Sequence, residues 1–208
     1  MGLVLYDNPA SSNALKVRFV LVEAGLSFER REVPLARPRP EEYLRVNPLG
    51  LIPALDDDGF VVCESHTIMR YAALRAGRDD LYPAAVRDRV RVDEFLDRFA
   101  GTIRPAFFRV EMPALGYVPG QGFGAAPPDA ERTAAAIAEL TPVLETLEGL
   151  VGDRGVVLDR FTIADCALAP VLFRHQRTGV DLEPYPRLSA LREAILSRPG
   201  WAAADPVA

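Results

Sequence analysis

The feature that most constrains the fold of this 208-residue chain is a change of hydrophobic period near residue 80. Before it, short apolar runs typical of strands alternate with segments of helical spacing. After the segment 79–83, Asp-Asp-Leu-Tyr-Pro, only helical periods follow. The sequence therefore predicts an α/β domain at 1–78, a linker at 79–86 and an all-helical domain at 87–208.

The first domain is expected to contain, in order, a strand, a helix, a strand, a short helix, two strands and a helix. The strands are predicted at 3–6, 28–35, 52–56 and 60–63, and the two longer helices between Ser11 and Gly25 and at 65–76. Strands one and two, joined through a helix, would pair in parallel. The result is one small sheet covered by helices.

The second domain is predicted from helical periods alone. Its helices are expected at 86–110, 129–151, 163–174 and 187–197, with a Gly- and Pro-rich loop at 113–128. The apolar stripe of the first of these helices is expected to consist of Val90, Phe95 (or Val92), Leu96 and Phe99.

Charge and cysteine usage exclude several classes of function. The net charge of −5 argues against a nucleic-acid binder, because phosphate contacts need clustered Lys and Arg. Cys63 and Cys166 have no metal or redox spacing, and two distant histidines without a third ligand predict no metal site. No apolar run approaches the roughly 20 residues needed to cross a bilayer. With no recognisable signal peptide, the cytoplasm is the expected compartment.

Three local features of the first domain are candidates for chemistry. The first is Ser11-Ser12-Asn13, at the start of the first helix. A helix N-terminus favours an anion, and a hydroxyl there can donate to a thiolate and keep it ionised near neutral pH. The competing interpretation is a plain N-cap, the usual role of Ser at this position.

The other two features flank strands three and four. Pro53 can adopt a cis bond that would leave the backbone of Ile52 free to pair with an extended peptide, although a trans proline at the start of an edge strand is the more common case. Glu64 and Ser65 open the next helix, with Ser65 expected as its N-cap, and together suit an ammonium and a carboxylate group. In one row along the sheet, the three features offer a thiolate site, a peptide-pairing backbone and an amino-acid clamp.

These segments resemble the soluble glutathione transferase family, in particular its serine-type classes. The resemblance rests on residues 5–18, on the run Asn-Pro-Leu-Gly-Leu-Ile-Pro-Ala-Leu at 47–55, on 64–68, on 161–165 and on the tail from 185 to 201. It covers nearly the whole chain in the right order. It implies a thioredoxin-like first domain that binds glutathione and an all-α second domain that supplies the site for the acceptor.

By this resemblance, Ser11 donates a hydrogen bond to the glutathione sulfur, with Ser12 and Tyr6 as alternative donors. Ser12 and Asn13 would also belong to the glutathione-binding site. The remaining implied contacts are Arg39 for the glycyl carboxylate, the Ile52 backbone beside a cis Pro53 for the cysteinyl unit, and Glu64 and Ser65 for the γ-glutamyl group. Leu51 would also belong to the glutathione-binding site. Many relatives have Lys or Gln where Leu51 stands, so one polar contact is missing.

The resemblance further implies transfer of glutathione, as co-substrate, to a small hydrophobic electrophile, by a homodimeric enzyme. The acceptor pocket is expected to consist of Phe107, Phe108, Val110, Met112 and Tyr117, although core packing competes as an explanation for each. Two alternatives stay open: a non-catalytic glutathione-binding or regulatory protein of the same fold, and a glutathione-dependent isomerase or dehalogenase. Asn13 stands where zeta-class isomerases have Cys.

Overall fold

A four-stranded mixed sheet forms the N-terminal part of the structure, a computed structural model that describes residues 2–204. Its strands are β1 (Leu3–Asp7), β2 (Phe28–Glu32), β3 (Ala54–Asp57) and β4 (Phe60–Cys63), in the spatial order β2-β1-β3-β4. β1 and β2 are parallel, while β3 runs antiparallel to both β1 and β4. The predicted parallel pairing of the first two strands is confirmed.

Two strands are shorter than predicted, and proline explains both ends. The ladder between β1 and β2 closes with a hydrogen bond from the Val33 N–H to the Asp7 carbonyl, 2.7 Å long. The next residue, Pro34, has no N–H with which to continue it. β3 begins at Ala54, directly after Pro53, for the same reason.

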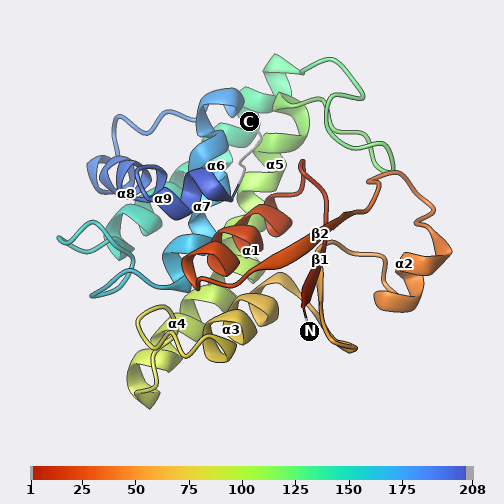
Figure 1. The fold of residues 1–208 in the computed structure, drawn as a ribbon. Helices are drawn as coiled ribbons and strands as arrows, with labels where there is room; N and C mark the ends of the chain where they lie inside the picture. Colours follow the sequence, from red (N-terminus) through yellow and green to blue (C-terminus); the bar gives the residue numbers. More distant parts are fainter. Residues whose placement is uncertain (1, 205–208) are drawn as a thin grey trace.

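Helices cover the two faces of the sheet unequally (Figure 1). α1 (Ser12–Glu23) and α3 (Ser65–Arg75) pack together on one face, where Leu3 and Leu5 of β1 join the main core. The short α2 (Glu41–Val46) lies on the other face, and its Tyr43 belongs to a second, smaller cluster. Tyr6 alternates out of the main core and packs beside Tyr43.

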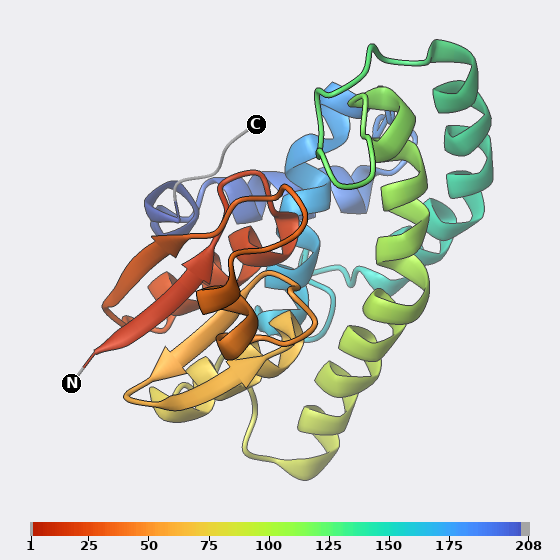
Figure 2. The same cartoon turned by 90° about the vertical axis from the view of Figure 1, so that its right-hand side faces the viewer.

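In the C-terminal part, residues 86–204, every regular element is a helix, apart from one isolated β-bridge between Val118 and Gly122. This part contains α4 (Val86–Arg98), the π-helix η1 (Phe99–Ile103), α5 (Arg104–Ala114), α6 (Ala130–Leu150), α7 (Ile163–Thr178), α8 (Pro186–Leu196) and α9 (Pro199–Ala203). Figure 2 shows that the first three form one long helical run beside the sheet domain. The predicted fold class, α/β followed by all-α, is confirmed, whereas α9 was not predicted.

The predicted stripe of α4 is wrong at one position. Val90 is 55% exposed, whereas Val92 is fully buried. Val92, Phe95, Leu96 and Phe99 follow the i, i+3, i+4, i+7 pattern of a single helix face. Val90 lies two residues before that face begins and therefore points to solvent.

One core joins the two parts and fixes α1 between them. The ring of Phe19 on α1 meets Trp201 of α9 edge-on, with centroids 5.3 Å apart. One turn further along, at the C-terminal end of α1, Glu23 forms an ion pair with Arg198, and α7 packs against α1. At the N-terminal end of α1, Arg104 and Arg174 of the helical domain bond to Ser12 and to the Ala10 carbonyl, so residues of both parts meet there.

Candidate active site

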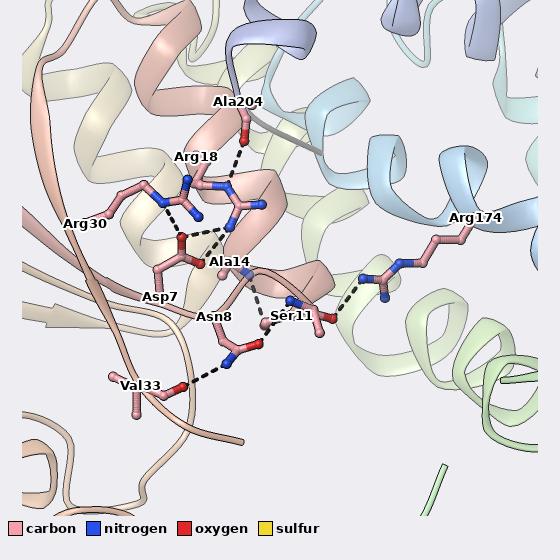
Figure 3. A network of polar contacts seen from close by, with 10 residues as sticks. Asp7, Asn8, Ser11, Ala14, Arg18, Arg30, Val33, Arg174 and Ala204 are labelled. Atoms are coloured by element: carbon pink, nitrogen blue, oxygen red, sulfur yellow. Dashed lines mark hydrogen bonds and ion pairs between the residues drawn. The ribbon is translucent and has the colours of Figure 1, made fainter. Parts of the chain in front are cut away.

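The turn between β1 and α1 is built around Asn8 (Figure 3). The Asn8 amide donates to the Val33 carbonyl at 3.0 Å, and its side-chain oxygen accepts from the Ala10 N–H at 3.0 Å. The Asn8 carbonyl accepts from the Ser11 N–H at 2.9 Å. One asparagine therefore fixes the backbone on which Ser11 stands.

Ser11 and Ser12 have different environments. Ser11 is the N-cap of α1, and its half-buried hydroxyl oxygen accepts from the Ala14 N–H at 3.2 Å. Ser12 is buried, and its hydroxyl oxygen accepts from Arg104 at 3.0 Å. The hydroxyl proton of Ser11 has no acceptor among residues 2–204. Ser11 therefore retains a free donor at a helix N-terminus.

Two arginines of the helical domain reach this turn from α5 and α7. Arg174 Nη2 donates to the Ala10 carbonyl at 2.8 Å, one residue before Ser11. Arg104 Nη2 donates to Ser12 and also to Glu111 Oε2, 2.7 Å away. Neither arginine nor the glutamate was predicted, since their partners are up to 164 positions away in sequence.

A buried lysine lies one helical turn behind Ser12. Lys16 Nζ is 2.9 Å from His66 Nε2 and lies 5.0 Å from the centre of the Phe99 ring. Burial, helped by the charge of Arg104, lowers the pKa of Lys16 to about 7. Burial and then the charge of Lys16 lower the pKa of His66 to about 3. The pair connects α1 to the first turn of α3.

The segment before β3 has the predicted cis bond between Ile52 and Pro53. Tyr43 and Asn47 both donate to the Leu51 carbonyl, the latter at 2.8 Å. These bonds fix the backbone just before Ile52, which lies outside the registered strand pairs. The side chain of Leu51 itself is 47% exposed.

Arg39 is largely engaged by its own loop. Its Nε donates to the Gly50 carbonyl at 3.0 Å, and its Nη1 donates to the carbonyls of Pro34 and Ala36. Burial, then the charge of Arg37, lowers the pKa of Arg39. The side chain thus holds the 34–39 loop against the turn that carries Leu51.

Glu64 and Ser65 depart from the prediction in one respect. The N-cap position of α3 is Glu64, so Ser65 is the first helical residue and not the cap. Glu64 has a φ of 66°, a left-handed conformation that costs a non-glycine residue about 1–3 kcal/mol. The conformation leaves its carboxylate exposed at the helix N-terminus, beside the first N–H groups of α3.

Tyr6 lies on the face of the sheet that carries α2. Its ring centroid is 5.6 Å from that of Tyr43, and its hydroxyl accepts from Arg31 at 3.5 Å. Residues of β1 alternate between faces, so the side chain of Tyr6 is directed away from the face that carries α1. The hydroxyl of Ser11, in contrast, caps α1 itself.

The five predicted acceptor residues divide into two groups. Phe107 and Val110 are 3% and 1% exposed and belong to the core, so they offer no surface to an acceptor in this structure. Phe108, Met112 and Tyr117 are partly exposed. The helical period of α5 explains the division, because 107 and 110 share its inward face.

An aromatic cluster stands next to the two arginines. The rings of Phe108, Tyr117 and Phe123 lie with centroids 5.2–6.1 Å apart. The guanidinium of Arg104 lies 5.1 Å from the centre of Phe108, and that of Arg174 lies 5.8 Å from Phe123. Phe123 was not predicted, because it lies in the glycine-rich loop rather than on a patterned helix.

Comparison with known proteins identifies the family. The glutathione S-transferase N-terminal domain model matches residues 10–75, and the C-terminal domain model matches residues 130–194. Glutathione S-transferase 3 of Zea mays is 35% identical over 96% of this chain and 91% of its own length. Probable maleylacetoacetate isomerase 2 of Drosophila melanogaster is 28% identical, over 98% and 87%.

Among solved structures, glutathione S-transferase III in its apo form has a TM-score of 0.80 and 30% identity. The match covers 98% of this chain and 95% of that one. The chain belongs to the glutathione S-transferase family, whose co-substrate is glutathione. The predicted family, the thioredoxin-like first domain and the class of enzyme are confirmed. No helix in residues 2–204 has the length and apolar character to cross a membrane.

Proposed function

We propose that this enzyme activates the thiol of glutathione with Ser11 and transfers it to an electrophilic carbon of a small acceptor. The supporting observation is the state of the Ser11 hydroxyl, which accepts from the Ala14 N–H and keeps its own proton to donate. Ser12 is only 7% exposed, whereas the half-buried Ser11 is more accessible to a bound thiol, and Tyr6 lies on the other face of the sheet. Ser11 is therefore the proposed donor.

The chemistry follows from the environment of Ser11. A free thiol has a pKa of about 8.5, so only a few per cent is thiolate at neutral pH. A hydrogen bond from Ser11 and the positive end of α1 both favour the thiolate over the thiol. The thiolate then forms the new S–C bond while the acceptor's leaving group departs with its electron pair, or while the electrons of a conjugated double bond shift.

The rest of glutathione is proposed to lie along the sheet edge. Glu64 and Ser65 would hold the γ-glutamyl ammonium and carboxylate, and the Ile52 backbone would pair with the cysteinyl unit. Asn13 would line the first turn, and Arg39 would lie near the glycyl carboxylate. The exposed Leu51 contributes no polar contact, which lowers affinity by about one to two decades if relatives gain a charge-assisted hydrogen bond there.

Kinetics with glutathione and chlorodinitrobenzene test the donor. Ser11→Ala should lower turnover, whereas Ser12→Ala and Tyr6→Phe should retain most of it. Calorimetric titration of glutathione shows whether each variant still binds. Full activity in Ser11→Ala together with loss in Tyr6→Phe contradicts the proposal.

Two other functions share this site. The likeness to a maleylacetoacetate isomerase favours glutathione-dependent isomerisation as the second candidate, although Asn13 stands where zeta-class members have Cys. Turnover of a cis-enone substrate without net consumption of glutathione would distinguish it. A non-catalytic glutathione-binding protein, favoured by Leu51, would bind glutathione in the titration and turn over neither acceptor.

We also propose that the enzyme is a homodimer. Among the described residues, five of the seven large exposed apolar side chains belong to β4, α3 and α4: Phe60, Val61, Leu74, Val86 and Val90. Sedimentation should give twice the chain mass, and Leu74→Glu should shift it toward the monomer.

Cys63 and Cys166 are free thiols, which suits a reducing cytoplasm as the proposed compartment.

A further inference from the structure

We propose that the acceptor of this enzyme carries a carboxylate, which binds to Arg174 and Arg104 beside Ser11. This inference rests on the proposed function and specifies its substrate class. It adds to the expected hydrophobic acceptor an anionic group at a defined place. The subsite lies where α5 and α7 reach the turn between β1 and α1.

Arg174 is the principal residue of this subsite. It is only 4% exposed, and its side chain extends from α7 toward the turn that carries Ser11 (Figure 3), where it donates to the Ala10 carbonyl. One nitrogen, Nη2, makes that bond. The other two, Nε and Nη1, are buried and have no hydrogen-bond partner among residues 2–204. Buried guanidinium nitrogens are normally satisfied, so two unpaired ones at a candidate active site indicate a missing acceptor.

Arg104 presents a third such nitrogen. Its Nη2 is shared between Ser12 and Glu111, while Nη1 is buried and also lacks a partner in the described part of the chain. Glu111 Oε1 is unpaired as well, but that carboxylate already forms an ion pair with Arg104. Three donor nitrogens therefore stand against one acceptor oxygen.

The charge around Arg174 and Arg104 also favours an anion. Two guanidinium groups face one carboxylate, that of Glu111, while the charge of the nearby Lys16, when it is protonated, is opposed by Glu64. Burial lowers the pKa of Arg174, and Glu111 opposes this effect while the charges of Arg104, Arg177 and Arg18 add to it. An anion is the group that corrects this imbalance, and a planar carboxylate matches the fork of a guanidinium.

The aromatic cluster fits the remainder of such an acceptor. Phe108 lies against the guanidinium of Arg104, and Phe123 lies against that of Arg174. The ring of Tyr117 contacts both phenylalanine rings. An aryl electrophile would place its ring on this apolar surface and its carboxylate on the arginines. A purely apolar acceptor would leave the buried N–H groups without partners, which is costly.

Matched acceptors test the inference on the full chain. The first pair is 4-chloro-3-nitrobenzoate and its neutral amide, and the second is 2-chloro-5-nitrobenzoate and its amide. The two pairs place the carboxylate at different distances from the reacting carbon. Each kcat/KM is divided by the rate constant of the uncatalysed reaction with glutathione, which removes the electronic effect of the substituent.

The wild-type enzyme should prefer the benzoate of at least one pair by about tenfold to a hundredfold, the factor of a charge-assisted hydrogen bond. Arg174→Gln should abolish this preference while retaining turnover of the amide, and Arg174→Lys should keep part of it. Arg177→Gln, which removes the same charge from an exposed position three residues further along α7, should leave it intact.

The inference is overturned if the wild type prefers the benzoate in neither pair, or if Arg174→Gln leaves that preference unchanged. The unpaired nitrogens then bind water only. Should Arg174→Gln fail to fold, calorimetry of the two S-aryl glutathione products on the wild type decides, with tighter binding expected for the carboxylate. Failure of the proposed function looks different, because neither amide nor benzoate would then be turned over.

Discussion

Lys16 is the only lysine in the sequence, and the structure buries it. Its pKa of about 7 lies below the ordinary value of 10.5, chiefly because burial disfavours the charged form. The folded protein therefore binds fewer protons than the unfolded chain between pH 7 and pH 10.5. Stability should rise with pH across that window, and the full penalty of the buried charge is present below pH 7.

The difference between 10.5 and about 7 corresponds to an upper limit of about 5 kcal/mol, at 1.36 kcal/mol per pKa unit. Lys16→Met should remove this pH dependence and raise the free energy of unfolding most near pH 7. His66 does not interfere in this window, because its pKa of about 3 places its own effect between pH 3 and 6.5, where stability falls with acid.

Two measurements check this reasoning. Urea unfolding of the wild type and of Lys16→Met at pH 7, 8, 9 and 10 gives the free energy of unfolding at each pH. The change of this free energy with pH is then compared between the two proteins. Because there is a single lysine, carbon-13 labelling of the lysine Cε gives one NMR signal, whose titration reports the pKa directly. A lysine pKa near 10.5, or the same pH dependence of the free energy of unfolding in the two proteins, refutes the argument from burial.

Three further variants test stability by urea unfolding. Thr162→Ala removes the cap of α7 and should cost about 1 kcal/mol with activity unchanged. Gly116→Ala would place its Cβ 1.8 Å from a backbone carbonyl oxygen, so it should cost more than Gly120→Ala, which shares the positive φ but meets open space. Asp7→Asn breaks the buried ion pair with Arg18 and should cost about 3–5 kcal/mol.

The sequence predicted those parts of the site that depend on local chemistry. Ser11 caps α1 because a hydroxyl before a helix satisfies its free N–H groups, whereas a proline entering a strand only allows the cis bond at Pro53, which the family resemblance implied. Both signals lie within a few residues of the feature that they predict. The order of strands and helices along the chain of the first domain likewise followed from the hydrophobic periodicity of each segment.

What the sequence did not predict depends on contacts over long distances along the chain. Arg174 reaches Ala10 across 164 positions, and Arg104 reaches Ser12 across 92. Nothing near either arginine distinguishes it from the exposed arginines of the same helices. The inward rotation of Phe107 likewise depends on how α5 packs, since several phases of that apolar segment were equally consistent with a helix.

The central claim is that Ser11 lowers the pKa of the bound glutathione thiol. Ultraviolet absorbance of the thiolate, titrated with pH on the binary complex, measures that pKa directly. The wild type should give a value about one to two units below the free thiol, and Ser11→Ala should restore most of the difference. An unchanged thiol pKa in Ser11→Ala, with a shift in Ser12→Ala or Tyr6→Phe instead, would contradict the account.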